Sequence, residues 1–424
     1  MNKTVVKKII VEQKQEISRI LRKSFVEREK EALLRESLSD DLIKIVTGVR
    51  RSGKSSLIHR VLKDKRYGYL NFDDERLRKV EVDKLDSILE ILHEVEGDIS
   101  ILFFDEIQNV KGWELFVSRL RRQGYTIFVT GSNSKLLSRE LATHLTGRHF
   151  SLELYPFSFK EHLRFKEIGI EQDDLITTKG RAKLQNELEE YLNKGGFPES
   201  LSVAQPQTYL RELYTKIILQ DIVGRYNLKH KETLKDIAHY LLGNFATRQT
   251  YHKIRNVFEI SSVHTIKNYL GYLEEAYLIF QLIGFSAKQK ESLRGPKKIY
   301  GIDQGLIRAV ESGMSENIGR FIENLVFIEL KRRDKNVFYY MDYSGWEVDF
   351  VLKKGSKITN LIQVVYNLNN VELRNREFRS LLKSSNKFNC DKLQVVVYYG
   401  ERENKIIKGK KIEIIPLLDW LLDK

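Results

Sequence analysis

Short apolar runs alternate with amphipathic segments in the N-terminal part of the chain. The runs over 42–46, 99–104 and 125–130 consist mostly of apolar residues, which is typical of parallel strands that are buried on both faces. The run over 57–62 has apolar residues at helical intervals, and 10–36 alternates charged and apolar positions as one or two amphipathic helices would. This succession predicts an α/β fold built on a parallel sheet.

The middle of the chain has a different rhythm. After residue 160 the sequence becomes helical and charged, and farther on three helices precede two short strands with a basic tip between them. The helices are predicted over 234–242, 251–258 and 262–278, and the strands over 279–283 and 297–300. This is the order of a winged helix-turn-helix, whose third helix can enter the major groove of DNA.

The C-terminal part predicts a helix, three strands, a second helix and a last strand. These elements are predicted over 320–330, 337–341, 347–352, 361–366, 372–382 and 393–399. The succession α-β-β-β-α-β has Glu323 on its first helix, Asp349 within a strand and Gln363 on the next strand. It resembles the restriction-endonuclease-like PD-(D/E)xK fold.

Composition limits the class of protein. A chain of 424 residues suggests about three domains at roughly 150 residues each. Apolar stretches such as 278–285 are far shorter than the ~20 residues of a membrane span, and the first residues lack the apolar core of a signal peptide. The single cysteine, Cys390, excludes an internal disulfide and a cysteine-based zinc site. We therefore expect a cytoplasmic protein that does not bind a membrane.

The chain is basic, with 72 Lys and Arg against 58 Asp and Glu, a net charge of +14. This balance favours polyanionic partners, nucleic acid first, although it can equally be a diffuse charge that keeps the protein soluble. The tip between the two middle strands has a local charge of +4, from five basic residues against Glu291. The five are Lys288, Lys290, Arg294, Lys297 and Lys298. Such a wing suits contacts to DNA phosphates. Glu274 and Glu275 are poorly placed for reading bases, so the docking of a protein partner is the alternative.

The first chemical motif follows the run over 42–46. Gly48 and Gly53 bracket four residues and precede Lys54 and Ser55, which gives the phosphate-loop spacing GxxxxGKS. Backbone NH groups of such a loop cradle a polyphosphate at a helix N-terminus, Lys54 would reach the β and γ phosphates, and Ser55 would bind Mg²⁺. The predicted ATP-binding residues are Gly48, Val49, Arg50, Arg51, Ser52, Gly53, Lys54, Ser55 and Ser56. An ordinary glycine turn before a helix is the alternative.

The second motif is the pair Asp105 and Glu106 at the end of the apolar run over 99–104. Carboxylates at the end of so apolar a strand need a functional reason, and downstream of a phosphate loop they form a Walker B pair. Asp105 would hold Mg²⁺, and Glu106 would orient or deprotonate the water that attacks ATP. The two motifs together predict a magnesium-dependent ATPase.

Two later residues are candidates for assisting hydrolysis. Asn133 follows the run over 125–130 and could position the water, as the sensor of AAA-type ATPases does, or it could cap a helix that begins at Ser134. Arg148 follows a turn and could stabilise charge on the transferred phosphoryl group of its own or a neighbouring subunit. The alternative for Arg148 is a surface arginine, and a role in trans would require a homo-oligomer.

Five segments together resemble the prokaryotic AAA-superfamily ATPases that carry a C-terminal domain of unknown function. They are Gly48–Ser55, Phe103–Gln108, Thr130–Ser134, Leu145–Arg148 and Leu154–Phe159. The resemblance covers essentially the whole chain, and it implies an ATP-binding AAA core, a winged-helix middle and a nuclease-like end. We expect N-terminal helices (1–36), the AAA-type core (37–160), a helical lid (161–230), the winged-helix domain (231–310) and the restriction-endonuclease-like domain (311–424).

The nuclease-like end lacks one part of its chemistry. Cleavage by this fold needs oxygen ligands for a metal ion and a lysine two residues after the third ligand. Glu323, Asp349 and Gln363 fit a second metal site, but Val365 stands at the lysine position. We therefore expect a retained fold with little or no cleavage, unless a lysine such as one of the pair 353–354 moves into the site.

The leading hypothesis is an ATP-hydrolysing AAA-type switch or motor that acts on nucleic acid through a basic winged helix. One alternative is a metal-dependent nuclease that ATP regulates. The other is a signalling or docking ATPase that acts on a protein partner.

Overall fold

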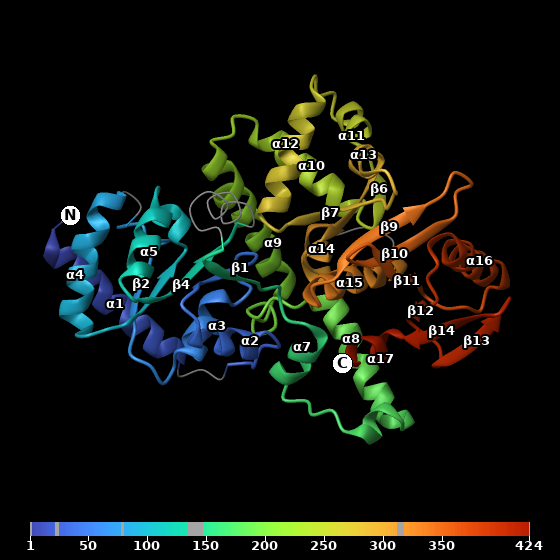
Figure 1. Ribbon diagram of the computed structural model, residues 1–424, viewed down its shortest axis with the longest axis horizontal. Coiled ribbons are helices and arrows are strands. Elements are labelled where there is room, and N and C mark those ends of the chain that lie inside the picture. The colour runs from blue at the N-terminus through green and yellow to red at the C-terminus, as the bar shows by residue number, and fades with distance from the viewer. Residues whose placement is uncertain (1, 22–24, 78–79, 134–146, 312–317, 424) are drawn as a thin grey trace. The chain divides into compact units, whose positions relative to one another are not determined.

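The computed structural model describes residues 2–21, 25–77, 80–133, 147–311 and 318–423. The chain, drawn as a ribbon in Figure 1, divides into two units. The first is Met1–Pro156 together with Glu275–Tyr277, and the second is Phe157–Glu274 together with Leu278–Lys424. Within the described ranges, no helix combines the length and the apolar character that crossing a membrane requires.

The first unit is built on a five-stranded sheet in the order β2-β3-β4-β1-β5. Every neighbouring pair of strands is parallel, which confirms the parallel α/β sheet predicted from the apolar runs. The strands are β1 (Ile43–Thr47), β2 (Gly68–Asn71), β3 (Ile101–Asp105), β4 (Thr126–Gly131) and β5 (His149–Glu153). Because the strands are parallel, the carboxyl ends of β1, β3 and β4 lie at the same edge of the sheet.

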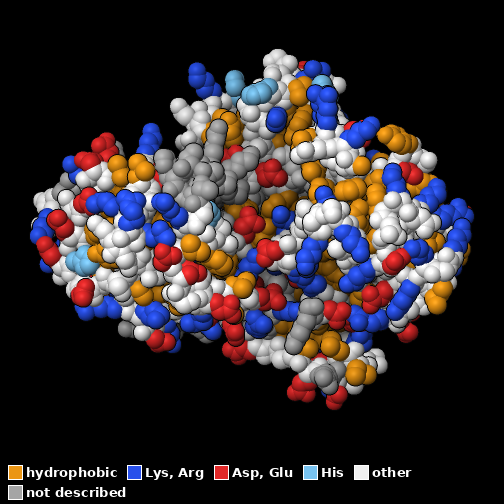
Figure 2. Space-filling view, viewed as in Figure 1, with side chains coloured by type: hydrophobic (Ala, Val, Ile, Leu, Met, Phe, Trp, Pro, Cys, Tyr) orange, Lys and Arg blue, Asp and Glu red, His pale blue; other side chains and the backbone are white. Residues whose placement is uncertain are grey.

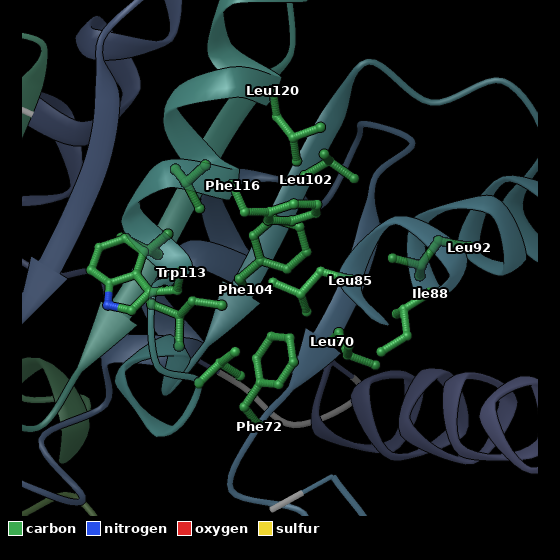
Figure 3. Close-up of a cluster of buried hydrophobic side chains, with 14 of the residues drawn as sticks. Leu70, Phe72, Leu85, Ile88, Leu92, Leu102, Phe104, Trp113, Phe116 and Leu120 are labelled. Atoms are coloured by element: carbon green, nitrogen blue, oxygen red, sulfur yellow. The ribbon is translucent and has the colours of Figure 1, made fainter. Parts of the chain in front are cut away.

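Both faces of this sheet are buried. Phe103 and Phe104 are adjacent on β3, so their side chains point to opposite faces, and each is buried in a different apolar cluster. The cluster of Phe103 includes Leu57 of α3, and the cluster of Phe104, drawn in Figure 3, includes Leu92 of α4 and Phe116 of α5. The helices of this unit are α1 (Lys3–Leu21), α2 (Glu31–Glu36), α3 (Lys54–Val61), α4 (Leu85–Glu96) and α5 (Trp113–Arg122).

The second unit begins with helices and continues with a small sheet. Its first helices are α7 (Phe159–Phe165), α8 (Thr178–Lys194), α9 (Pro206–Lys216), a π-helical segment (Ile217–Gly224) and α10 (Lys231–Gly243). Next come β6 (Thr247–Gln249), α11 (Tyr251–Val257), α12 (Val263–Glu275), β7 (Ile279–Ile283), α13 (Gln289–Arg294), β8 (Lys297–Gly301) and α14 (Gln304–Val310). The three strands are antiparallel in the order β6-β8-β7. The strands β7 and β8 were predicted from the sequence, and β6 was not. The segment between β7 and β8 was predicted only as a basic tip, and part of it forms α13.

The remainder of the second unit is a six-stranded mixed sheet in the order β13-β14-β12-β11-β10-β9. Strands β9, β10 and β11 are antiparallel neighbours, whereas β11, β12 and β14 run parallel. The elements are α15 (Ile318–Arg332), β9 (Asn336–Met341), β10 (Glu347–Lys354), β11 (Lys357–Val365), α16 (Val371–Phe388), β12 (Leu393–Val397), β13 (Glu403–Ile407), β14 (Lys410–Pro416) and α17 (Leu417–Leu422). The predicted α-β-β-β-α-β succession is present from α15 to β12, and the last three elements were not predicted.

Candidate nucleotide-binding site

The glycine-rich loop begins at the carboxyl end of β1 and ends where α3 starts at Lys54. Gly48 has a φ of 150° and Gly53 a φ of 93°, conformations that L side chains rarely adopt. A Cβ atom on Gly48 would lie 2.0 Å from the carbonyl oxygen of Leu154, so no side chain fits there. The loop therefore needs glycine both for its turn and for its close contact with the chain that follows β5.

Lys54 lies between this loop and the end of β3. Its ammonium donates hydrogen bonds to the carbonyl oxygens of Gly48 at 3.1 Å and Val49 at 3.2 Å. The same Nζ atom lies 3.5 Å from Oε1 of Glu106, and the lysine side chain is only 4% exposed. Because a buried charge is weakly screened, the ammonium of Lys54 acts strongly on the groups beside it, Glu106 among them.

Asp105 ends β3 and is held by three hydroxyl groups. Tyr69 donates to Oδ2 at 3.1 Å, Thr130 donates to Oδ1, and the Ser55 hydroxyl also hydrogen-bonds to this carboxylate. Burial raises the pKa of Asp105, and the negative charge of Glu106 adds to that rise. Ser55 and Asp105 therefore bring together a hydroxyl and a carboxylate, oxygen groups of the kind that Mg²⁺ prefers.

Glu106 stands directly after β3 in a left-handed conformation, with a φ of 52°. A residue other than glycine in this region is strained, and such strain concentrates at functional sites. Burial alone would raise the pKa of Glu106, but the positive charges of Lys54 and Arg50 bring it down to about 2. Its Oε2 accepts hydrogen bonds from Gln108 and from the backbone NH of Ser132 at 3.3 Å. Glu106 is therefore a fixed carboxylate at neutral pH.

The carboxyl end of β4 completes the site. Thr130 is fully buried, and its Oγ1 accepts from the backbone NH of Glu106 at 2.9 Å while it donates to Asp105. Asn133 is buried two residues after β4 ends. The alternative role of Asn133, capping a helix from Ser134, concerns residues outside the described ranges. The predicted loop residues, Asp105, Glu106 and Asn133 thus follow the carboxyl ends of adjacent parallel strands.

Comparison with known proteins places the chain in a family. The uncharacterized protein MJ1544 of Methanocaldococcus jannaschii is 37% identical over 400 residues, which span 90% of this chain and 88% of that protein. This chain belongs to the family of MJ1544. An uncharacterized protein of Haemophilus influenzae is 34% identical over 402 residues, covering 90% of this chain and 94% of the relative.

Family models divide this member of the MJ1544 family into three matched regions. An AAA domain matches residues 40–163, a domain of unknown function (DUF8612) matches 185–317, and a second one (DUF4143) matches 318–420. The AAA match agrees with the phosphate loop, the Walker B pair and the parallel sheet. The first unit therefore contains a P-loop ATPase domain of the AAA type, which we call the AAA domain.

Two solved structures show distant similarity. The Walker-type ATPase PABY2304 of Pyrococcus abyssi is 17% identical with a TM-score of 0.43, covering 68% of this chain and 96% of that one. Domain III of the Thermotoga maritima replication initiation protein DnaA is 15% identical with a TM-score of 0.23, covering 36% of this chain and 76% of that one. The family assignment does not depend on either.

Arg148 lies at the opposite edge of the AAA sheet from the phosphate loop. Its carbonyl oxygen accepts from the backbone NH of Ile43 at 3.1 Å, where β1 begins, whereas the loop follows Thr47 at the other end of β1. Five strand residues at roughly 3.3 Å each separate these edges by about 16 Å, which an arginine side chain does not span. A role of Arg148 at its own loop does not fit this placement, and a role at a neighbouring subunit stays a prediction.

Several residues that hold the AAA site together were not predicted from the sequence. Thr130 and Tyr69 position Asp105, and Arg28 is a buried residue that donates to the carbonyl oxygens of Ser52 at 2.8 Å and Tyr155 at 2.6 Å. The sequence does contain a signal for Thr130, because a hydroxyl side chain near the end of the buried strand beside the Walker B strand can reach the Walker B carboxylate. Arg28 gives no such signal, because its contacts are made by residues far along the chain.

The predicted DNA-contacting wing needs one correction. Lys298 is buried in β8, and its ammonium contacts Glu323 and Asp349 rather than solvent. The prediction that Lys298 binds DNA is therefore wrong, because the carboxylates of the same unit already hold its charge. Lys297 is half-buried and donates to the carbonyl oxygens of Leu293 at 2.9 Å and Gly295 at 3.2 Å.

The residues predicted for a second metal site lie close together, but with Lys298 among them. In the ranges that the structure describes, no group of three or more His, Cys, Asp or Glu could hold a metal ion. Gln363 uses its Oε1 to accept from the backbone NH of Asp349 at 2.8 Å. The cation between Glu323 and Asp349 is thus a lysine ammonium.

Proposed function

We propose that this chain binds ATP with Mg²⁺ at the phosphate loop of its AAA domain and hydrolyses it. The observation that carries the proposal is the meeting of Lys54, Asp105 and Glu106 at the carboxyl edge of the parallel sheet, with Glu106 ionised. An ionised carboxylate beside a phosphate-binding loop can act on the water that hydrolyses a nucleotide.

Different residues of the site would bind the phosphates, the Mg²⁺ ion and the attacking water. The loop NH groups and the N-terminus of α3 would receive the phosphates, and Lys54 would exchange its two loop carbonyls for phosphate oxygens. Ser55 and Asp105 would hold Mg²⁺, which would offset the negative charge of the phosphates. Glu106 would orient the attacking water or accept its proton, and buried Asn133 is a candidate for positioning the same water.

The polar atoms of the loop fit an anionic ligand. The Oγ atom of Ser52 is buried and has no hydrogen-bond partner in the described part of the chain. Arg50 and Lys54 both act on Glu106 with positive charge. A polyphosphate would offer the Ser52 hydroxyl an acceptor and would give the two cations charge-assisted hydrogen bonds.

Replacement of Lys54 tests the proposal. Lys54→Ala should lower ATP turnover by about 100-fold or more, since two hydrogen bonds from a charged donor contribute about 3 kcal/mol at the least. Lys63→Ala is the matched control, because Lys63 is an exposed lysine shortly after the same helix. Equal turnover by the two variants would contradict the assigned site.

We propose in addition that the ATPase acts on DNA through the second unit. The order α10-β6-α11-α12-β7-α13-β8 and the sheet order β6-β8-β7 support a winged helix with α12 as its recognition helix and α13 in the tip between the last two strands. Exposed basic or polar side chains occur on α12 and at the tip: His264, Lys267, Lys288, Lys290 and Arg294. Figure 2 shows Lys and Arg mixed with Asp and Glu over the visible face, so net charge alone does not locate a DNA-binding surface.

Salt dependence tests the DNA proposal. Each phosphate contact contributes about 0.9 to the slope of log K against log salt concentration, so removal of Lys288, Lys290 and Arg294 should reduce the slope by about 2.7. The control removes an equal charge from exposed positions of the AAA domain, Lys63, Lys65 and Arg66. An equal slope in both triple-alanine variants would contradict the proposed surface. Specific capture of a protein without salt-dependent DNA binding would favour a docking ATPase.

A further inference from the structure

Three residues from the middle of the chain belong to the first unit. They are Glu275–Tyr277, although the body of α12 before them and β7 after them belong to the second unit. Tyr277 is only 2% exposed, and its φ of 61° lies in the left-handed region. A bulky side chain rarely adopts this conformation, and such strain concentrates at functional sites. Tyr277 is therefore a buried and strained residue of the first unit, two residues after α12 ends.

The hydroxyl of Tyr277 contacts the residue that precedes the phosphate loop. It forms hydrogen bonds with Oγ1 of Thr47 at 2.9 Å and with Oε1 of Glu153 at 3.2 Å. Thr47 ends β1 and Glu153 ends β5, and the two residues are paired in the parallel sheet. Burial raises the pKa of Tyr277 well above its ordinary value, and the negative charge of Glu153 adds to that rise. Tyr277 therefore keeps its proton at the carboxyl edge of the AAA sheet.

Thr47 is in turn joined closely to the phosphate loop. Its carbonyl oxygen accepts from the backbone NH of Leu154 at 2.7 Å, and the next residue, Gly48, is packed against the carbonyl oxygen of Leu154. The carbonyl oxygen of Gly48 accepts from Nζ of Lys54 at 3.1 Å. In the proposed function, Lys54 exchanges this carbonyl for a phosphate oxygen when ATP binds. The hydrogen bond that ATP would replace is thus made by the residue next to the one that Tyr277 contacts.

The helix α12 can carry a change at its C-terminal end along its whole length. It has 13 residues, which span about 20 Å at about 1.5 Å per residue. Its buried side chains, Ile266, Tyr269, Leu270 and Leu273, recur at helical intervals along one face. Rigid and well-packed elements of this kind can carry coupling between distant sites.

We propose that Tyr277 is a positioning residue that couples the phosphate loop to α12, so that a nucleotide bound at the loop slows hydrogen exchange in α12. This inference rests on the proposed binding of ATP, and it does not require α12 to contact DNA. The phosphates order the loop, and the hydroxyl of Tyr277 extends that order to the end of α12 through Thr47. The coupling is reciprocal, because a partner that orders α12 would favour nucleotide binding by the same factor.

Hydrogen exchange of the full-length chain, measured by mass spectrometry with and without a saturating nonhydrolysable ATP analogue and Mg²⁺, tests the coupling. Peptides that cover the phosphate loop report whether the analogue is bound, and peptides that cover α12 report the coupling. Tyr277→Phe removes the hydroxyl and keeps the ring. Tyr191→Phe is the matched control, because Tyr191 is also buried and its hydroxyl donates to the carbonyl oxygen of Phe157, a residue of the second unit.

In the wild type and in Tyr191→Phe, the analogue should slow exchange in the loop and, by about fivefold or more, in α12. In Tyr277→Phe, exchange in the loop should still slow, whereas exchange in α12 should not respond. A role in stability alone would change α12 exchange equally with and without the analogue. An equal α12 response in Tyr277→Phe and the wild type would overturn the proposal, as would a wild-type α12 that does not respond while the loop does.

The loop peptides separate this inference from the proposed function. A wild-type loop whose exchange the analogue leaves unchanged would contradict ATP binding and the coupling together. If Tyr277→Phe does not fold, variants of Thr47 decide the question. Thr47→Ser keeps the hydroxyl and should keep the α12 response, whereas Thr47→Val removes the hydroxyl and should lose the response. Equal responses in these two variants would overturn the proposal.

Discussion

Thr130→Val removes one hydroxyl from the centre of the AAA site and changes the side-chain shape little. That hydroxyl donates to Oδ1 of Asp105 and accepts from the backbone NH of Glu106 at 2.9 Å. Because Thr130 is fully buried, water cannot replace either bond. Valine would leave a buried carboxylate oxygen and a buried NH group without these partners.

The size of the effect follows from these two bonds. A hydrogen bond to a charged group contributes about 1.5–3 kcal/mol, and an unsatisfied buried NH group costs about 1–3 kcal/mol. We therefore expect Thr130→Val to lower the free energy of unfolding of the AAA domain by about 3 kcal/mol. At a slope of about 2 kcal/mol per molar urea, the midpoint would fall by about 1.5 M. Thr130→Ser keeps the hydroxyl and should lose about 1 kcal/mol at most.

The pH dependence of this penalty has a definite sign. Burial raises the pKa of Asp105, and the Thr130 hydrogen bond opposes that rise. A raised pKa means that the folded state binds the proton more tightly than the unfolded state, so stability falls as the pH rises through the folded pKa. Loss of the Thr130 bond raises this pKa further, and the penalty of Thr130→Val should be larger near neutral pH than in mild acid.

Trp113 fluorescence reports this unfolding specifically, because Trp113 lies in the core of the first unit. The measurement uses a background in which Trp346 and Trp420, both of the second unit, are replaced by Phe. The variants are compared in urea, and ATP turnover is recorded alongside. Equal urea midpoints for Thr130→Val and Thr130→Ser would refute the role that we assign to the hydroxyl.

Three further predictions concern single positions. Gly48→Ala should abolish binding of a fluorescent ATP analogue, because its Cβ would lie 2.0 Å from the Leu154 carbonyl oxygen. The control Gly169→Ala, whose Cβ meets no atom within 4 Å, should bind the analogue normally. Normal binding by Gly48→Ala would contradict the loop geometry. Wild-type Glu323 has a pKa raised to about 7, so it stabilises the fold below that pH and ceases to do so above it. Glu323→Gln should therefore make the melting temperature of the second unit less sensitive to pH around 7. The same pH dependence of the melting temperature in the variant and the wild type would contradict this. Arg148→Ala should leave the Kd for ATP of the isolated chain unchanged, and a Kd about tenfold weaker would contradict its placement at the far edge of the sheet.

The sequence was sufficient to predict the AAA site because its signals are local. The phosphate loop occupies consecutive positions, and the run ending in Asp105 and Glu106 is apolar on both faces. The structure gives the reason, since Phe103 and Phe104 fill clusters on opposite sides of the sheet. Each motif follows a parallel strand, so the fold brings the motifs to one edge without further information.

Contacts between segments that are distant in the sequence could not be predicted from the sequence alone. Lys298 looked like one more cation of a basic tip, and only tertiary packing brings it to Glu323 and Glu347. Arg148 followed a turn, as an arginine finger could, but the direction of β5 places it at the amino edge of the sheet. Both side chains are cations, as the sequence states, but the sequence alone does not say which groups surround them in the folded chain.

The C-terminal hairpin was missed although a local signal for it exists. Strands β13 and β14 are joined by Lys408 and Gly409, whose φ values of 49° and 74° are both positive. Two such residues form the tight turn that suits a two-residue hairpin. Strands β13 and β14 contain many charged residues, so the alternation of apolar and polar positions that indicates a strand is weak in this part of the sequence.

The most direct test of the central claim is single-turnover hydrolysis by Glu106→Gln. The amide keeps the shape of the side chain but cannot accept a proton from water, so the variant should bind labelled ATP as the wild type does and retain it unhydrolysed. Wild-type protein should convert its bound ATP to ADP under the same conditions. Conversion by Glu106→Gln at the wild-type rate, or an absence of ATP binding by both proteins, would contradict the account.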